Sequence, residues 1–418
     1  MKTDIRPVAP GKRIEMLDTL RGLAIFGILM VNMQIFFKPV TTMLIGYTGT
    51  ESVVDMIAHS FIKFFFEGKF YVLFSMLFGY GFWIFLSKSS VSSQRIIVVF
   101  RRRVLVLLII GLFHVVLLWA GDILVFYALF GFLLILFRKE PDRILVKWSL
   151  WLAAIPVLLT ALMVALITLA QLHPESRVAV ETNMQQQVSY TQEIIQKATV
   201  IYSIGSHADI VKIRLKEYQM LLPGILFFYP MVLAMFLIGV WAARKEIISK
   251  YQQNLPFFRK ALRWSLPIGL ATNSLYVFSY FHATMNIPSV WSLLRTLSHT
   301  IGGFSFGVLY VSLIVVLTSK GKLLRINQYL ASVGRMALTN YLLHSIICST
   351  LFLSYGFEMF GKLNTLQGIL LAVLIFLLQI PVSHLWLKHF NYGPFEWVWR
   401  CLTYMKWHPF LKKAIAEI

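Results

Sequence analysis

The sequence contains few acidic residues and almost no cysteine. Only 18 of its 418 residues are Asp or Glu, and its two cysteines, Cys348 and Cys401, cannot form a disulfide framework or a cysteine-based metal site. The chain has no GxxxxGKS phosphate loop and no HExxH zinc helix. A GxSxG string at 303–307 lies inside an apolar run, whereas a nucleophile elbow needs a sharp turn. We therefore expect no metal site, and ATP-driven transport, zinc proteolysis and serine hydrolysis lose support.

Hydrophobic residues dominate the chain. They make up 58% of it, and the mean hydropathy is +0.72. Lipid offers no partner for unpaired backbone groups, so apolar runs of this length are expected to be helices. We predict an all-α fold, a polytopic integral membrane helical bundle with about ten transmembrane helices. The predicted spans are roughly 16–37, 70–87, 104–120, 122–138, 147–170, 219–242, 262–281, 297–318, 335–355 and 366–387.

The positive charge is distributed unevenly along the chain. The net charge is +21, and 29 of the 39 Lys and Arg residues fall in alternate gaps between the predicted spans. Such an asymmetry sets the orientation of membrane proteins, with the basic gaps inside the cell. We therefore predict that the N- and C-termini are both cytoplasmic. The charge then serves topology and attraction to anionic lipid, and we expect no nucleic acid as a partner.

One polar insertion divides the chain. Residues 171–216 are predicted to form an extracytoplasmic loop, with helical character around Thr191–Ile201. The loop separates an N-terminal membrane half, 1–170, from a C-terminal half, 217–390, each with five helices. Residues 391–418 mix Trp, Tyr, Arg and Lys and are predicted to form a tail at the cytoplasmic interface.

The first predicted helix carries polar side chains where lipid would disfavour them. Arg21 and Asn32 are eleven residues apart, so they share one helical face at a separation of about 16 Å. With Asp18 they form a polar line that suits a path from the cytoplasm into the bundle. The alternative is an interfacial ion pair between Asp18 and Arg21, with Asn32 in an interhelical hydrogen bond.

A second group of polar residues lies between the third and fourth predicted helices. His114 is deep in one helix, and Asp122 begins the next after a short turn. A carboxylate beside an imidazole fixes the tautomer and raises the basicity, as a general base requires. We therefore predict this pair at the outer mouth of the helical hairpin. The alternatives are an N-cap role for Asp122 and simple packing for His114.

The ninth predicted helix supplies a further candidate. Asn340 and His344 are four residues apart and point the same way, after Arg335 at the start of the helix. His344 is an alternative to His114 as the catalytic base.

Several long motifs resemble the YeiB family of bacterial inner-membrane proteins. In family order they are LDTLRGLAIFGILMVN, FYVLFSMLFGYG, GLFHVVLLWAGDIL, GRMALTNYLLHSIICSTLF and GPFEWVWRCLTY, which leaves only the 171–216 loop without a match. The resemblance implies a multi-pass protein of the bacterial cell (inner) membrane.

The opening LDTLRG with a following Asn is similar to the first helix of transmembrane acyltransferases. These include the heparan-sulfate acetyltransferase type and the bacterial O-acyltransferases of surface polysaccharides. The similarity implies transfer of an acyl group from cytoplasmic acyl-CoA or acetyl-CoA to a hydroxyl or amine at the outer side. Neither group's catalytic histidine is matched in place, because Asn32 stands where the O-acyltransferases have a His and no His follows it in this helix. Acyl transfer would then depend on His114 with Asp122, or on His344.

For the acyltransferase hypothesis, the acceptor would be an envelope glycan or lipid, and either Asn32 or Asn340 would hydrogen-bond the developing oxyanion. The alternative is a proton-coupled transporter or exporter of a small or amphiphilic solute, in which the buried His and Asp carry protons. A non-catalytic sensor component is a third reading. The expected partners are the lipid bilayer, acyl-CoA and, as an open alternative, a second copy of the chain in a homodimer. The arginines expected to hold the phosphates of acyl-CoA are Arg21, Arg101, Arg102, Arg103 and Arg335.

Overall fold

The computed structural model describes residues 13–46, 52–87, 93–283 and 288–412. Within these ranges the regular structure is helical, apart from one isolated bridge between Phe390 and Leu411, so the predicted all-α fold is confirmed. The first helices are α1 (Glu15–Met33), η2 (Val40–Leu44), α2 (Val53–Phe65), α3 (Phe70–Leu86), α4 (Ser93–Leu117), α5 (Leu124–Leu134), η3 (Ile135–Lys139), α6 (Asp142–Ala170) and α7 (Pro174–Ile204). The remaining helices are α8 (His207–Phe228), α9 (Pro230–Arg244), α10 (Leu255–His282), α11 (Val290–Ser319), α12 (Leu324–Arg335), α13 (Ala337–Phe352), α14 (Thr365–His389) and α15 (Pro394–Tyr404).

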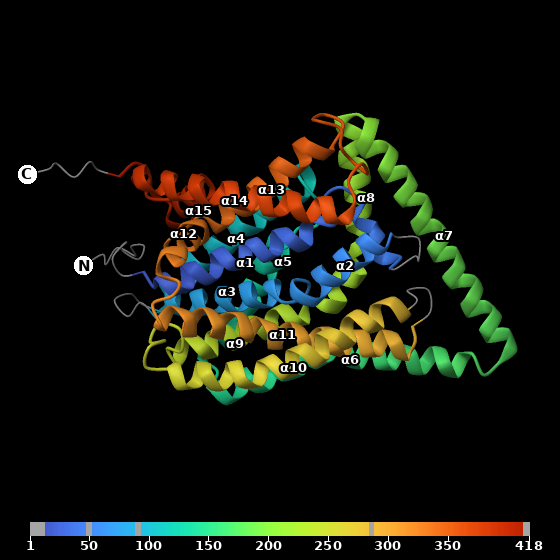
Figure 1. The fold of residues 1–418 in the computed structure, drawn as a ribbon, viewed down its shortest axis with the longest axis horizontal. Coiled ribbons are helices and arrows are strands. Elements are labelled where there is room, and N and C mark those ends of the chain that lie inside the picture. Colours follow the sequence, from blue (N-terminus) through green and yellow to red (C-terminus); the bar gives the residue numbers. More distant parts are fainter. Residues whose placement is uncertain (1–12, 47–51, 88–92, 284–287, 413–418) are drawn as a thin grey trace, which may run out of the picture.

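Most helices lie side by side along one direction and form a bundle (Figure 1). The start of α1, the end of α12 and α15 lie at the same end of this bundle, which we call the arginine end because it holds Arg13, Arg335 and Arg400. Parts of the predicted basic segments and of the C-terminal tail, namely residues 1–12, 88–92 and 413–418, lie outside the described residues.

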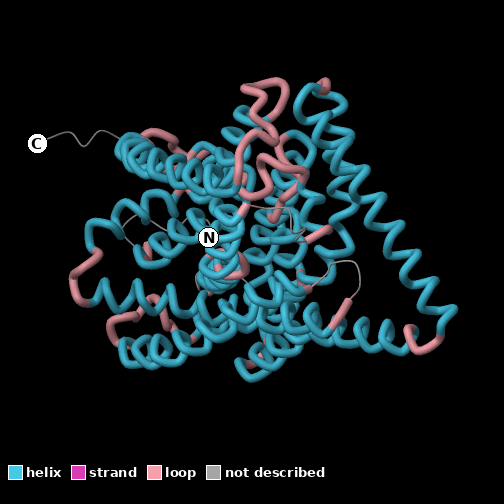
Figure 2. Tube along the Cα trace, turned by 45° about the vertical axis from the view of Figure 1, so that its right-hand side comes forward, coloured by secondary structure: helices cyan, strands magenta, loops and turns pink. Residues whose placement is uncertain are grey.

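The segment predicted as a polar loop with some helical character is helical over a longer stretch than expected, and its side of the membrane stays a prediction. Helix α7 has 31 residues, begins with Pro174 at its first turn and ends before Gly205. No Pro or Gly interrupts it in between, so the helix predicted around Thr191–Ile201 extends over nearly the whole segment. In Figures 1 and 2, α7 crosses the end of the bundle opposite the arginine end.

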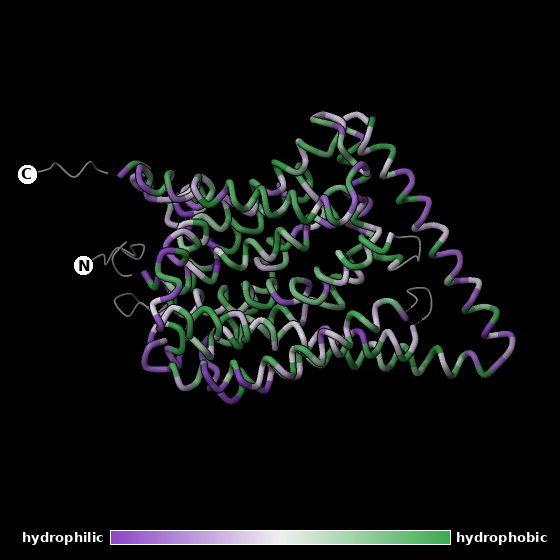
Figure 3. Tube along the Cα trace, viewed as in Figure 1, coloured by the Kyte–Doolittle hydropathy of each residue, from purple (hydrophilic) through white to green (hydrophobic). Residues whose placement is uncertain are grey.

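Several helices indicate a membrane protein. Among the described residues five helical segments are long and apolar enough to cross a membrane, or six if the pair α8 and α9, bent by 48° at the break before Pro230, is one span. In the apolar stretch of α6 only 11% of the residues are buried, against 72% in α1. The exposed leucines of α6 are favourable in contact with lipid, whereas in water they would form a large unburied apolar surface. Figure 3 shows hydrophilic residues gathered at the arginine end and along α7.

The ten predicted spans all fall on described helices, but 219–242 is divided between α8 and α9, and 122–138 between α5 and η3. Helix α4 carries three consecutive arginines, Arg101 to Arg103, and α5 has only 11 residues before it tightens into η3. Helix α13, with 16 residues, is apolar but shorter than a full span. The helices are therefore confirmed, whereas the number of crossings stays a prediction.

Helices α1 and α12 touch backbone to backbone. A Cβ atom at Gly22 would overlap the carbonyl oxygen of Leu330, and one at Gly334 would overlap that of Asp18. Two glycines thus allow the close approach that lipid-embedded helices favour. The contact brings Arg335 beside the first turn of α1.

We expect Gly334→Ala to destabilise the protein by about 1–3 kcal/mol, because the added methyl group meets backbone atoms that cannot rotate away. Thermal unfolding in detergent would show this as a lower Tm. Gly224→Ala in α8 is the matched control, since a Cβ there meets nothing within 4 Å. An unchanged Tm for Gly334→Ala would contradict the tight packing of α1 on α12.

Candidate functional site

A cavity of about 320 Å³ runs into the bundle from the arginine end. Its walls come from α1, α3, α4, α5, α12, α13 and α15, so helices from both halves of the chain enclose it. Arg13 and Arg21 mark the opening, because their side chains are 23% and 30% exposed. Along α1 the lining continues through Ile25 to Ile28, about 10 Å deeper than Arg21.

The opening of the cavity is strongly cationic. Among the described residues, five arginines but only two carboxylates, Asp18 and Glu396, line the cavity. Guanidinium groups gathered with too few carboxylates form a binding site for a polyanion such as a phosphate ester. The five arginines are Arg13, Arg21, Arg103, Arg335 and Arg400.

Both carboxylates are already engaged. Asp18 pairs with Arg21 at 2.7 Å and lies 3.9 Å from Arg13. Glu396 accepts hydrogen bonds from the backbone N–H groups of Leu338 and Thr339, at 2.6 and 3.0 Å, and so caps the N-terminus of α13. Burial raises the pKa of Glu396 above its usual range, although these hydrogen bonds act in the opposite direction.

Of the other arginines, Arg103 packs on an aromatic ring, and Arg335 has one nitrogen without a hydrogen-bond partner among the described residues. The guanidinium carbon of Arg103 lies 3.8 Å from the ring centroid of Trp399 in α15. The buried Nε atom of Arg335 has no hydrogen-bond partner among the described residues. Arg335 therefore presents an unused donor next to the cavity.

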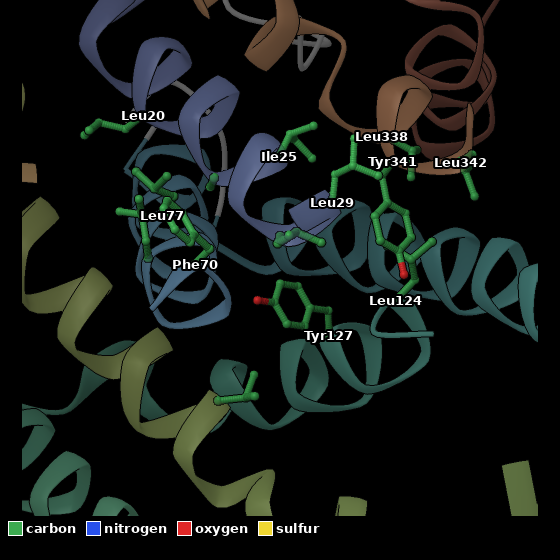
Figure 4. Packing of buried hydrophobic residues seen from close by; sticks show 14 of the residues in the cluster. Leu20, Ile25, Leu29, Phe70, Leu77, Leu124, Tyr127, Leu338, Tyr341 and Leu342 are labelled. Atoms are coloured by element: carbon green, nitrogen blue, oxygen red, sulfur yellow. The ribbon is translucent and has the colours of Figure 1, made fainter. Parts of the chain in front are cut away.

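Beyond the arginines the cavity wall is apolar and ends at two tyrosines. Figure 4 shows side chains of α1, α3, α5 and α13 converging, among them Leu77, Leu124, Tyr127 and Tyr341, which all line the cavity. The hydroxyl group of Tyr127 lies 2.7 Å from Ser75 Oγ. The buried hydroxyl group of Tyr341 donates to no acceptor among the described residues.

Behind this end of the cavity lies a buried row of three polar side chains. His114 Nδ1 is 2.8 Å from Asp122 Oδ1, so the predicted contact is present. On the other side of the ring, His114 Nε2 is 2.8 Å from Ser345 Oγ. The three residues are only 1%, 3% and 1% exposed. Ser345, His114 and Asp122 thus have the connectivity of a nucleophile, a base and an orienting acid.

The α4–α5 hairpin explains why His114 and Asp122 meet. A Cβ atom at Gly111 would come within 2.7 Å of the backbone nitrogen of Val125, so only glycine allows the two helices to approach this closely. Asp122 Oδ2 accepts a hydrogen bond of 2.7 Å from that same Val125 N–H. Asp122 therefore has both predicted roles: one carboxylate oxygen lies against the His114 imidazole, and the other caps the N-terminus of α5.

Helix α13 brings Ser345 to the hairpin. Tyr341 and Ser345 are four residues apart and share a helical face, as do Ser345 and Ser349, whose hydroxyl donates to the Leu118 carbonyl at 3.2 Å. The ring centroids of Tyr341 and His114 lie 5.3 Å apart. Since Tyr341 lines the cavity, the three-residue row begins one side chain behind its end. The imidazole is buried, and the outer side predicted for this end of the hairpin stays a prediction.

The polar residues on the opposite face of α13 belong to a separate network. His344 Nε2 lies 2.7 Å from Gln379 Oε1, and the Asn340 side-chain amide donates to Ser383 Oγ at 3.0 Å. Both partners are on α14, and neither Asn340 nor His344 lines the cavity. The structure therefore does not place His344 beside the cavity as a base, or Asn340 as an oxyanion donor.

Asn32 and two of the predicted arginines also lie away from the cavity. Asn32 does continue the face of Arg21, but the cavity ends one turn earlier, at Ile28. Arg101 is exposed, and Arg102 donates to the Thr403 carbonyl oxygen at 3.3 Å, so neither lines the cavity. Of the arginines predicted to hold phosphate, Arg21, Arg103 and Arg335 do line it. The residues that sequence reasoning missed are Ser345 and Tyr341 at the inner end and Arg13 and Arg400 at the opening.

Comparison with known proteins gives relatives along the full length. A family profile described as "Protein of unknown function (DUF418)" matches residues 242–406. The chain is 32% identical to "Uncharacterized protein YxaH" of Bacillus subtilis (strain 168) over 432 aligned positions, which cover 99% of each chain. It is 29% identical to "Uncharacterized protein YeiB" of Escherichia coli (strain K12), over 95% of this chain and 98% of that one. No solved structure shows a significant match.

Proposed function

The chain belongs to the YeiB family, and from its cavity and buried polar row we propose that it is a membrane acyltransferase. It would move an acyl group from cytoplasmic acyl-CoA to an acceptor hydroxyl or amine at the outer side. One observation supports this function above all others: a cavity with an arginine-rich opening and apolar walls ends next to an imidazole held by a carboxylate.

The opening matches the charged part of acyl-CoA. Phosphate groups prefer arginine, whose planar guanidinium donates two parallel hydrogen bonds. Arg335, with a buried Nε that has no partner, and Arg13, which Asp18 only approaches at 3.9 Å, are the arginines most available for such bonds. Arg21 is held closer to Asp18 and contributes mainly charge.

The inner part of the cavity matches the acyl and pantetheine part. Its walls, including Leu77 and Leu124, are apolar, and they exclude the water that would hydrolyse a thioester. A thioester at the inner end would lie against Tyr341, one side chain away from His114. His114, kept in one tautomer by Asp122, would remove the proton of the attacking hydroxyl group.

The proposal includes an orientation in the membrane. Hydrophilic residues gather at the end of the bundle where the arginine-lined cavity opens (Figure 3), and basic segments favour the cytoplasm. We therefore place both termini and the opening in the cytoplasm of a bacterial cell, with about ten crossings of the inner membrane. In this arrangement acyl-CoA reaches its site without crossing lipid.

A proton-coupled transporter or exporter is the second candidate, and one cluster favours it. Lys63 in the last turn of α2 pairs at 2.9 Å with Glu67 in the turn before α3, and Tyr276 donates to Glu67 at 2.7 Å. Ionisable groups held inside a membrane often mark a path for protons or ions.

The test uses the full chain in lipid nanodiscs with acetyl-CoA and an extract of envelope lipids and glycans. We expect saturable binding of CoA, release of its free thiol, and transfer of a labelled acetyl group to a component of the extract. Absence of CoA binding and of thiol release, together with solute uptake driven by a proton gradient in proteoliposomes, would favour the transporter instead.

A further inference from the structure

We propose that Ser345 is the nucleophile of this site and carries the acyl group as an ester between two half-reactions. The inference rests on the proposed function and goes beyond it, since a histidine base alone needs no acyl-enzyme. Ser345 would be the covalent acyl carrier, His114 the base that serves both half-reactions, and Asp122 a positioning residue that acts through His114.

The contacts of the His114 ring indicate which of its nitrogens acts as the base and which hydroxyl it deprotonates. The Nδ1 atom of His114 faces Asp122 Oδ1 at 2.8 Å, and its Nε2 atom faces Ser345 Oγ at 2.8 Å. The contact between Nδ1 and Oδ1 is a close pairing of imidazole and carboxylate, and neither atom has a hydrogen-bond partner among the described residues. Nε2 is the only ring nitrogen free to take a proton, and the hydroxyl that touches it is Ser345. An acceptor hydroxyl could reach the base directly only by displacing Ser345.

The surroundings of Ser345 suit a nucleophile rather than a packing serine. Serines in helices commonly donate to the carbonyl oxygen four residues earlier, as Ser60 and Ser332 do here. The Ser345 hydroxyl instead turns to an imidazole 231 residues away in the chain. A hydroxyl bonded to a base that is itself held by a carboxylate is the arrangement that activates serine.

Tyr341 supplies a donor for the oxyanion. Its hydroxyl is buried, donates to no acceptor among the described residues, and lies on the same face of α13 as Ser345, one turn earlier. A buried phenol whose proton has no acceptor is costly, so the site gains when an oxygen of the substrate accepts that proton. Such a donor stabilises the charge that develops on the thioester carbonyl oxygen.

Both half-reactions balance with these groups alone. In the first, Ser345 Oγ attacks the thioester carbonyl carbon while its proton passes to His114 Nε2, the C–S bond breaks, and the same proton goes to the leaving thiolate of CoA. In the second, the acceptor hydroxyl loses its proton to His114 Nε2 and attacks the ester, and Ser345 Oγ leaves and regains that proton. No oxidant or metal takes part. The ester separates donor and acceptor in time, so CoA can leave before the acceptor binds.

The test uses an alkyl fluorophosphonate on the full chain in nanodiscs. This probe phosphonylates activated serines with loss of fluoride, and its alkyl chain suits the apolar cavity wall. We expect labelling that peptide mass spectrometry places on Ser345, at least a hundredfold weaker labelling in His114→Ala, and no label in Ser345→Ala. Ser349→Ala, one turn further along α13, should label like the wild type, because its hydroxyl contacts only the Leu118 carbonyl.

Incubation with acetyl-CoA in the absence of acceptor provides the second arm. We expect one acetyl group on Ser345, and Ser345→Cys should still be acetylated, as a thioester that hydroxylamine removes faster. Acetyl transfer by Ser345→Ala at the wild-type rate, with an unlabelled wild-type Ser345, would overturn the acyl-serine inference and leave the acyltransferase intact. Probe labelling of Ser345 with no acetylation and no CoA release would support the activated serine and remove acyl-CoA as the donor.

Discussion

Replacing Asp122 by Asn should lower the rate of acyl transfer by about a thousandfold to ten-thousandfold. One carboxylate oxygen lies 2.8 Å from His114 Nδ1, and the other accepts a hydrogen bond from the Val125 N–H. An Asn has a single acceptor oxygen, so one contact must be replaced by an N–H group that repels its partner. If the amide nitrogen faces His114, the imidazole takes the wrong tautomer and Nε2 can no longer accept a proton. A comparable change in serine enzymes lowers kcat by about ten-thousandfold.

The measurement is the rate of CoA release with acceptor present, together with the Tm of each variant in detergent. Glu217→Gln is the matched control, because Glu217 is equally buried and accepts from Thr41 and Tyr202 but has no contact with His114. It should keep the wild-type rate. His114→Ala should lose about as much activity as Asp122→Asn, and the double variant little more, since members of one catalytic unit do not act additively. A normal rate in a folded Asp122→Asn would remove this row from the mechanism.

The fold could be predicted from the sequence where one physical property dominated. Apolar runs locate the helices of ten segments, one of them broken between α8 and α9, because lipid and packing both require apolar side chains there. The same criterion does not apply to 171–216, which is polar and in which the sequence indicates helix only around Thr191–Ile201. Helix α7 forms because its residues tolerate helical backbone over 31 positions, and polarity only decides that it is exposed. Apolar length also does not fix how many of the helices cross the membrane.

Only the contacts between residues close in the sequence could be predicted for the candidate site. His114 and Asp122 are eight residues apart across a tight hairpin, so their contact followed from the sequence. The contact between His114 and Ser345 joins positions 231 residues apart and depends on how α13 packs against α4. The only sequence signal for Ser345 was its spacing of four residues from Tyr341, and such spacing is common in helices. Asn32 failed for a related reason, because a shared helical face does not tell how deep a cavity reaches.

The second large effect is expected on the affinity for CoA, which depends on the cationic opening of the cavity. We expect the double variant Arg13→Gln and Arg335→Gln to raise the Kd for CoA by about a hundredfold. Each arginine would lose at least one charge-assisted hydrogen bond to phosphate, worth roughly 1.5 kcal/mol or slightly more than tenfold in affinity. Arg21 is left in place because it pairs with the buried Asp18 at 2.7 Å, and its removal would disturb the fold.

Titration with CoA at low and high salt measures how much affinity the double variant loses and how much of that loss is electrostatic. The wild type should bind more weakly as salt rises, and the double variant should show a smaller dependence, since it has two fewer charges for salt to screen. Arg101→Gln is the control within the same basic segment, because Arg101 is exposed and does not line the cavity, and its Kd should match the wild type. If Arg101→Gln and the double variant weaken CoA binding equally, the general positive charge of this surface attracts the ligand. A selective loss in the double variant would instead locate the phosphates at the opening of the cavity.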